Sequence, residues 1–222
     1  MGPETGAPEV PCTSDNNGGI TTGGGFSTLY DIPSWQAEQV AGYMSTVMGT
    51  SKQPASGYST SGRGYPDVSL LAHDYIVTLD QGNYGVDGTS ASTPVFAAFV
   101  ALVNAQRIAL GESVLGWINP ALYAYADEII LADPNTLENN CCASEGTSTV
   151  CCNQGFFAVN GWDPLTGIGS INFTAFSQVF TNGSITSVDN GSKSAAEKTL
   201  GAGSLASAFM LLLVFTASVL SL

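Results

Sequence analysis

Residues 95–103 form an uninterrupted run of valine, phenylalanine, alanine and leucine. A surface helix would carry polar residues on one side, so this run predicts a helix that is buried on every side. Thr93 suits the cap of the helix, and Pro94 suits its first position, where the amide hydrogen that proline lacks is not needed. Gly111 suits its end. The predicted helix therefore runs from about Pro94 to Leu110.

Other apolar patterns surround this helix. Apolar residues recur with helical spacing over Ser34–Met48, directly after Pro33. Tyr65–Leu71 and Tyr75–Leu79 are short apolar stretches separated by a polar break, and they predict two buried strands. Asn119–Tyr125 predicts a further, shorter helix. The predicted elements therefore include both helices and strands.

A turn of small residues precedes the apolar helix, because residues 88–94 read GTSASTP. Ser90 in this turn lies just ahead of the helix, whose unpaired amides and positive dipole end favour developing negative charge. The nucleophile of an acyl-transfer reaction belongs at such a position. A capped helix behind a glycine turn, without any chemistry, is the alternative interpretation.

The segment around Ser90 resembles the nucleophile motif of the sedolisin family, the acid-acting serine-carboxyl peptidases that include tripeptidyl peptidase. The usual motif begins with serine where this chain has Asp87. Four further segments resemble family motifs in the expected order. They are residues 23–27 (GGGFS), 62–69 (GRGYPDVS), 115–123 (LGWINPALY) and 161–169 (GWDPLTGIG). Several spaced motifs together are far more specific than one.

The resemblance implies an α/β, subtilisin-like fold with a parallel sheet flanked by helices, of which this chain carries the C-terminal portion. Residues 20–182 are then the C-terminal part of the peptidase domain. Residues 1–19 are rich in proline, glycine, asparagine and aspartate and are predicted to be a linker or a truncated remnant. Residues 183–204 read as a polar linker, and residues 205–222 form a hydrophobic tail.

The resemblance also implies the catalytic groups. Ser90 corresponds to the nucleophile, which sedolisins activate with a glutamate base, an orienting aspartate four residues later and an aspartic acid in the oxyanion hole. No glutamate in this chain has an aspartate four residues after it, so we expect the chain alone to be inactive. His73, the single histidine, lies in the polar break between two predicted strands. We expect it to be an exposed turn residue and assign it no chemistry.

One structural calcium ion is implied by the resemblance, held between two segments by carboxylates and backbone carbonyls. Calcium prefers such oxygen ligands and accepts irregular geometry. The predicted ligands are the side chains of Glu128 and Asp163 and the carbonyls of Ile129, Val159 and Gly161, with Asp127 as the alternative to Glu128. A solvated acidic turn without an ion is the other interpretation.

The charge and the cysteine content indicate which partners and which cellular compartment suit this chain. Five Lys and Arg oppose 18 Asp and Glu, a net charge of −13, which excludes nucleic acid as a partner. The five cysteines are Cys12, Cys141, Cys142, Cys151 and Cys152. Their spacing fits disulfides better than a zinc site, and disulfides indicate an oxidising compartment. Glycosylation sequons at Asn172, Asn182 and Asn190 agree with the secretory pathway.

The hydrophobic tail at residues 205–222 carries no charge and follows a polar spacer and the small residues 190–192. This order is typical of a glycolipid (GPI) anchor signal, with a membrane tail anchor as the alternative. We therefore expect a membrane-anchored protein that is extracellular or in an acidic, lysosome- or vacuole-like compartment.

The sequence as a whole predicts a serine-type peptidase of acidic compartments that acts on peptides or unfolded proteins, as an endopeptidase or a tripeptidyl-peptidase. A glycolipid-anchored surface glycoprotein that uses the same fold for binding, without catalysis, is the alternative.

Overall fold

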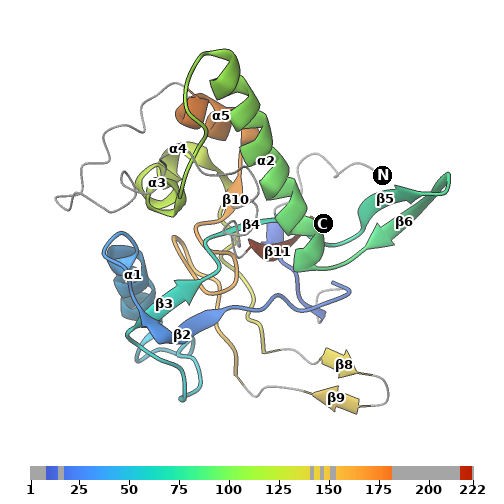
Figure 1. The fold of residues 1–222 in the computed structure, drawn as a ribbon. Helices are drawn as coiled ribbons and strands as arrows, with labels where there is room; N and C mark the ends of the chain where they lie inside the picture. The colour runs from blue at the N-terminus through green and yellow to red at the C-terminus, as the bar shows by residue number, and fades with distance from the viewer. Residues whose placement is uncertain are drawn as a thin grey trace.

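The structure of the 222-residue chain is a computed structural model. It describes residues 9–14, 18–140, 143–145, 148–150, 154–181 and 216–221. These residues form an α/β arrangement around a five-stranded sheet (Figure 1). The strands, in their order across the sheet, are β1 (Glu9–Pro11), β11 (Thr216–Ser221), β4 (Val68–Leu71), β10 (Ser170–Ile171) and β7 (Ile130–Ala132).

The sheet is mixed. Strands β11 and β10 run parallel to β4 at the centre, whereas the edge strands β1 and β7 are antiparallel to their neighbours. The predicted α/β class is therefore observed, but the sheet is not parallel throughout. At the β7 edge, no described helix lies between β7 and β10, so the connection lacks the helical crossover that usually joins parallel neighbours.

Two strands of this sheet lie where the sequence predicts no part of the domain. Strand β1 falls within residues 1–19, and β11 falls within the predicted hydrophobic tail, where it pairs with both β1 and β4. Most of residues 183–222 lies outside the described residues, so the anchor signal stays a prediction. Among the residues that the structure describes, no helix has the length and apolarity to cross a membrane.

Five helices are described: α1 (Ala37–Val47), α2 (Thr89–Ala109), α3 (Asn119–Ala124), α4 (Ala126–Ile129) and α5 (Phe173–Thr181). Helix α1 confirms the prediction made from apolar spacing, and α3 confirms the shorter helix predicted at Asn119–Tyr125. Helix α2 is the longest, and it packs against β4, β11 and α5 (Figure 1). The apolar run therefore forms a helix against the central sheet, as its composition suggests.

The predicted start of α2 is wrong. The helix begins at Thr89, and Pro94 lies inside it. Thr93 does not cap the helix, because its hydroxyl donates to the carbonyl of Thr89 one turn earlier, at 2.8 Å. Proline at this position removes the hydrogen bond that residue 94 would donate to the carbonyl of Ser90. The earlier start is held instead by the hydroxyl of Ser92, which donates to the carbonyl of Leu70 at 3.0 Å.

The prediction that α2 is buried on every side is also wrong. Phe96, Val100 and Val103 are buried on the face toward the sheet. On the opposite face, Leu102 is 53% exposed and Ile108 is 62% exposed. The described elements cover one face of this helix only, although the composition of both faces is apolar.

Three further strand pairs lie outside the main sheet. They are β2 (Gly25–Asp31) with β3 (Gly62–Tyr65), β5 (Tyr75–Leu79) with β6 (Gly82–Val86), and β8 (Ala143–Glu145) with β9 (Ser148–Val150). The predicted strand Tyr65–Leu71 is in fact two strands, β3 and β4, on either side of Pro66. Strand β5 has its predicted bounds but is exposed rather than buried. It forms a hairpin with β6 that projects from the body (Figure 1).

Candidate functional site

The segments that resemble sedolisin motifs meet in space. Gly24 lies directly against the carbonyl of Pro164, where a side chain would collide with the backbone. Gly64 packs in the same way against the ring of Trp162, whose indole nitrogen donates to the carbonyl of Pro66 at 2.8 Å. These glycines are needed because the segments approach each other more closely than a Cβ atom would allow. The glycine-rich turn, the 62–69 segment and the 161–169 segment therefore form one packed unit.

A buried polar network joins this unit to the 115–123 segment. The carboxylate of Asp67 is fully buried and accepts two hydrogen bonds from the guanidinium of Arg63, at 2.6 and 2.8 Å. It also accepts from Asn119 at 2.9 Å and from the hydroxyl of Tyr123 at 2.8 Å. Burial raises the pKa of Tyr123, and the charge of Asp67 adds to that rise. A carboxylate with this many donors is a structural anchor, because breaking a buried pair of this kind is strongly destabilising.

Ser90 lies in the first turn of α2 and is exposed. The turn before it is fixed at several points. The amide of Gly88 donates to the carbonyl of Ala72 at 2.8 Å, and the amide of Ala91 donates to the carbonyl of Gly88 at 2.9 Å. Gly88 has a φ of 144°, a conformation that glycine adopts far more readily than other residues. The Ser90 hydroxyl is therefore presented to solvent on a turn that is bound to the end of β4.

The position of Ser90 suits a nucleophile for electrostatic reasons. The first amides of an α-helix have no partner within the helix, and the helix dipole is positive at that end. A carbonyl oxygen that gained negative charge there would face backbone donors. The sequence predicted Ser90 just before the helix, and the structure places it one position inside the helix.

Asp163 occupies the centre of the second predicted site. Its side chain is fully buried and accepts hydrogen bonds from the amides of Val159, Leu165 and Thr166, at 3.1, 2.8 and 2.8 Å. Burial raises the pKa of Asp163 to about 7, the three amides oppose that rise, and the nearby carboxylate of Asp133 adds to it. Asp163 therefore holds the 159–167 loop together as well as being a candidate metal ligand.

Asp133 is a candidate ligand that the sequence analysis missed. One oxygen of its carboxylate accepts the amide hydrogen of Gly161 at 2.7 Å. The other oxygen is buried and has no hydrogen-bond partner among the described residues. Burial raises the pKa of Asp133 to about 6. The pairing of Ala132 with Ser170 across β7 and β10 brings Asp133 to this loop, which is a long-range contact that local sequence does not show.

The residues predicted for the other half of this site lie elsewhere. Asp127 and Glu128 are exposed on the short helix α4. The carbonyl of Ile129 accepts the amide hydrogen of Asn172 at 2.8 Å. The structure thus brings Gly161 and Asp163 together with Asp133, whereas Glu128 is exposed on α4. The sequence signal for Asp133 was its place before a proline at the end of an apolar stretch.

The remaining predicted features are only partly described. Cys12 is buried, and its Sγ lies 3.4 Å from the carbonyl of Ile20. The four other cysteines and the sequons at Asn182 and Asn190 lie outside the described residues. Asn172 begins α5, where its side-chain oxygen accepts the amide hydrogen of Ala175 at 3.1 Å. The disulfides and the glycosylation therefore stay predictions.

Together these features define an α/β protein with an exposed serine at the start of a helix that packs on the sheet, and a separate loop whose buried Asp163 lies near Asp133. No family model matches the chain. The chain is 43% identical over 157 residues to physarolisin of Physarum polycephalum, a match that covers 70% of this chain and 26% of that protein. It is 36% identical over 184 residues to tripeptidyl-peptidase sed1 of Aspergillus fumigatus, covering 78% and 26%. It is 37% identical over 162 residues to human tripeptidyl-peptidase 1, covering 72% and 28%.

Among solved structures, a Pseudomonas sedolisin, a serine-carboxyl proteinase complexed with pseudo-iodotyrostatin, matches with a TM-score of 0.50 and 25% identity. That match covers 73% of this chain and 38% of the sedolisin chain. The chain therefore belongs to the sedolisin family, of which it carries a segment. It spans about a quarter of the length of the relatives named above. None of these relatives supports the alternative of a glycolipid-anchored binding glycoprotein.

Proposed function

We propose that this protein supplies the nucleophile of a serine-type peptidase of the sedolisin kind, with Ser90 as the attacking residue. The observation that carries the proposal is the exposed Ser90 hydroxyl on a fixed turn at the start of α2, within a segment that resembles the family's nucleophile motif. Peptides or unfolded proteins are the substrates, as the names of the related peptidases suggest. Endopeptidase and tripeptidyl-peptidase action are both compatible with this site.

The reaction begins when the oxygen of Ser90 attacks the carbonyl carbon of the scissile peptide bond. A carboxylate base takes the hydroxyl proton, and such enzymes work in acid because the low pKa of a carboxylate keeps it ionised at that pH. The negative oxygen of the tetrahedral intermediate is stabilised by backbone donors and a carboxylic acid. The described part of this chain supplies the hydroxyl and the helix amides, and the base and the acid come from other residues.

We also propose a structural calcium ion at the loop that contains Asp163. Two carboxylates, Asp133 and Asp163, lie near each other with little exposure, and a buried oxygen of Asp133 has no partner among the described residues. A divalent cation that prefers oxygen ligands fits this set, because it would neutralise two nearby carboxylates that are otherwise stabilised only by backbone amides. The side chains of Asp133 and Asp163 and the carbonyls of Val159 and Gly161 would hold it. Asp133 thus takes the place that the sequence assigned to Glu128.

The nucleophile proposal is tested by replacing Ser90 with alanine in a polypeptide that also carries the remaining catalytic residues of a sedolisin domain. We expect Ser90→Ala to abolish hydrolysis of a peptide library at acid pH. Ser45→Ala is the matched control, because Ser45 is an exposed helical serine on α1, and this variant should keep full activity. Persistent acid peptidase activity in Ser90→Ala would refute the proposal.

The 222-residue chain by itself should not hydrolyse peptides between pH 3 and 7. The physical reason is the absence from its sequence of a glutamate with an aspartate four residues later, the pair that would activate Ser90. Purified chain assayed against the same library gives the measurement. Turnover that disappears in Ser90→Ala would show that another carboxylate of this chain acts as the base. The protein is proposed to act in an acidic compartment or outside the cell.

A further inference from the structure

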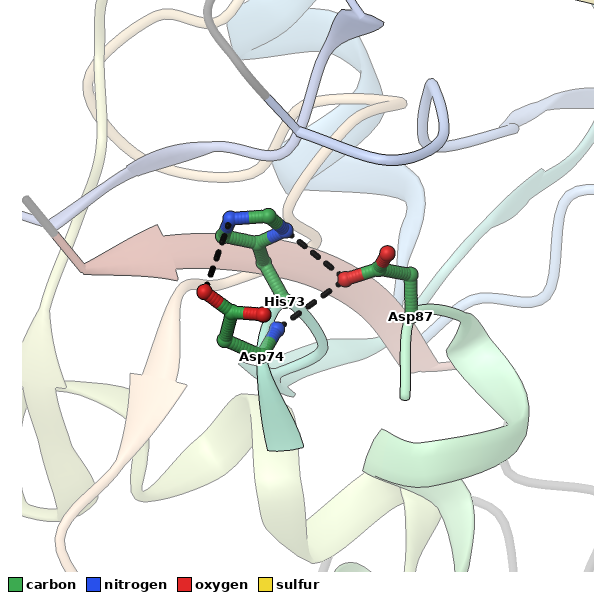
Figure 2. A group of neighbouring side chains, drawn as sticks. All are labelled: His73, Asp74 and Asp87. Carbon is green, nitrogen blue, oxygen red and sulfur yellow. Dashed lines mark hydrogen bonds and ion pairs between the residues drawn. The ribbon is translucent and has the colours of Figure 1, made fainter. Parts of the chain in front are cut away.

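His73 and Asp87 form a hydrogen-bonded pair directly before the turn that carries Ser90 (Figure 2). The Nδ1 atom of His73 lies 2.7 Å from Oδ1 of Asp87. The same oxygen accepts the amide hydrogen of Asp74 at 3.0 Å. The side chain of His73 is 22% exposed and that of Asp87 31%. His73 is therefore half-buried and hydrogen-bonded to Asp87, and the prediction of an exposed turn histidine is wrong.

The geometry fixes where the hydrogen lies. An ionised carboxylate only accepts hydrogen bonds, so Nδ1 of His73 donates to Asp87. The amide of Gly19 also faces this nitrogen, at the longer distance of 3.4 Å, and it would donate to Nδ1 only in the tautomer that has no hydrogen there. On the other side of the ring, Nε2 lies 3.6 Å from a carboxylate oxygen of Asp74. Two carboxylates thus flank the ring on opposite sides and hold it in one orientation (Figure 2).

These three side chains are close enough together to suggest a metal site. The observed contacts are nevertheless those of a hydrogen-bonded pair. Asp74 and Asp87 face different nitrogens of the ring.

The Asp87 carboxylate is enclosed by backbone as well. A side chain at Gly19 would collide with its second oxygen, so the N-terminal loop packs directly on the carboxylate. Two segments therefore contact Asp87, which directly follows β6: the loop at Gly19 and the loop after β4 that contains His73. These contacts favour one orientation of the carboxylate, which is still partly exposed.

This pair connects to Ser90 through the backbone. Asp87 is followed by Gly88, whose amide donates to the carbonyl of Ala72, the residue before His73, at 2.8 Å. The short loop after β4 therefore binds two consecutive residues of the turn. The hairpin on the other side of Asp87 offers weaker support, because β5 and β6 are exposed and an isolated two-stranded hairpin is only marginally stable.

We propose that His73 is a positioning residue for Ser90. By binding Asp87 it fixes the turn at residues 87–89 against the end of β4, and this sets the direction of the Ser90 hydroxyl. The pair also gives the charge of Asp87 a donor, in a position where the sedolisin motif has an uncharged serine. The hydrogen bond from Nδ1 draws part of that charge toward the imidazole, which reduces the opposition between the carboxylate and the negative charge that develops beside Ser90. The functional meaning of this positioning rests on the proposed role of Ser90 as nucleophile.

Native-state hydrogen exchange on the 222-residue chain tests the proposal, because it reports local opening separately from global unfolding. His73→Phe keeps a ring but removes the donor. We expect it to accelerate exchange of the amides of Gly88 and Ala91 by about tenfold, the effect of losing one charge-assisted hydrogen bond. The amides of Val100 and Val103, farther along the same helix, should be unaffected. His73→Asn, whose side-chain amide can donate in place of Nδ1, should restore most of the protection.

The Asp87→Ser background supplies a second test that does not depend on how well the single variant folds. There the carboxylate is gone, so His73→Phe should cause no further acceleration at Gly88. An unchanged exchange rate at Gly88 in His73→Phe, or an equal acceleration at Val103, would overturn the proposal. So would the same tenfold effect of His73→Phe in the Asp87→Ser background. Ser90→Ala should leave exchange at Gly88 unchanged, and its activity assay tests the nucleophile separately.

Discussion

The turn at Ser90 and the loop at Asp163 differ in what holds their key residue. Ser90 is exposed, and the turn around it is held by bonds from its neighbours, among them the amide of Gly88 and the hydroxyl of Ser92. Asp163 is fully buried, and its own carboxylate binds three backbone amides. One residue is positioned by its surroundings, and the other positions its surroundings.

This difference assigns Ser90 to the reaction and Asp163 to the stability of the fold. A nucleophile must reach substrate, so its side chain stays accessible and is not used to hold the surrounding backbone in place. A loop ligand can serve both purposes, because a carboxylate has enough lone pairs to accept backbone hydrogens and still face a cation. We therefore expect mutations at Asp163 to act on folding, and mutations at Ser90 to act on chemistry.

The largest expected effect is that of Asp163→Ala. Removal of the carboxylate leaves the buried amides of Val159, Leu165 and Thr166 without an acceptor, and each such loss is costly. The free energy of unfolding should fall by at least about 3 kcal/mol. Urea unfolding followed by tryptophan fluorescence measures this, since Trp162 is buried beside the loop. Glu128→Ala, which removes an exposed carboxylate, is the control and should stay within about 0.5 kcal/mol of the parent.

If Asp163→Ala were as stable as the parent, the claim that the Asp163 side chain holds the 159–167 loop would be wrong. It would mean that the three amides find other acceptors, and that the loop does not depend on this side chain. The Glu128→Ala control excludes a general effect of net charge, because both variants remove one carboxylate from a strongly acidic chain.

The second effect concerns calcium. An ion that binds only the native state should raise the stability by about 2.7 kcal/mol at a concentration of 100 Kd. Calorimetric melting in a calcium series, against a chelator blank, measures the shift for the parent, Asp133→Asn and Glu128→Gln. We expect Asp133→Asn to lose the response and Glu128→Gln to keep it. If instead Glu128→Gln lost the response and Asp133→Asn kept it, Glu128 would be the ligand, as the sequence predicted.

The sequence predicted those parts of the molecule that depend on neighbours along the chain. Apolar spacing located α1, the shorter helix α3 was also predicted, and the small-residue motif located Ser90. Prediction from the sequence failed where the burial of a side chain or the pairing of a strand depends on residues that are distant in the chain. Strand β5 was found with its bounds, but its exposure depends on what packs against it. Asp133 was missed because β7 reaches the 159–167 loop only through its pairing with β10.

The start of α2 failed for a related reason. Proline is favoured at the first position of a helix, and that preference put Pro94 there. Tertiary hydrogen bonds from Ser92 to the end of β4 extend the helix toward Ser90 in spite of it. The single histidine was likewise assigned to a solvent-exposed turn, because its partner Asp87 is fourteen residues further along the chain.

The third effect comes from Gly88. Its φ of 144° is in a region that other residues rarely adopt, so Gly88→Ala should cost on the order of 1–3 kcal/mol from backbone strain alone. Gly42→Ala is the matched control, because Gly42 is an exposed residue inside α1 with open space around a Cβ atom. That change should stabilise the protein by roughly 0.5–1 kcal/mol. Thermal unfolding distinguishes the two signs, and a Gly88→Ala variant no less stable than the parent would show that the turn has another conformation available.

The smallest expected effect is that of Ser90→Ala on stability. The side chain of Ser90 is exposed, and alanine is a better helix former than serine by a few tenths of a kcal/mol (about 0.5 at most). The free energy of unfolding should therefore change by less than about 0.5 kcal/mol, while the peptidase activity of the complete enzyme is abolished. Urea unfolding under the conditions used for Asp163→Ala gives the direct comparison. If Ser90→Ala lost more than about 1 kcal/mol, the Ser90 hydroxyl would itself be holding the start of α2. The Ser90 side chain would then hold the surrounding backbone in place, as that of Asp163 does. The proposed difference between the two residues would be wrong.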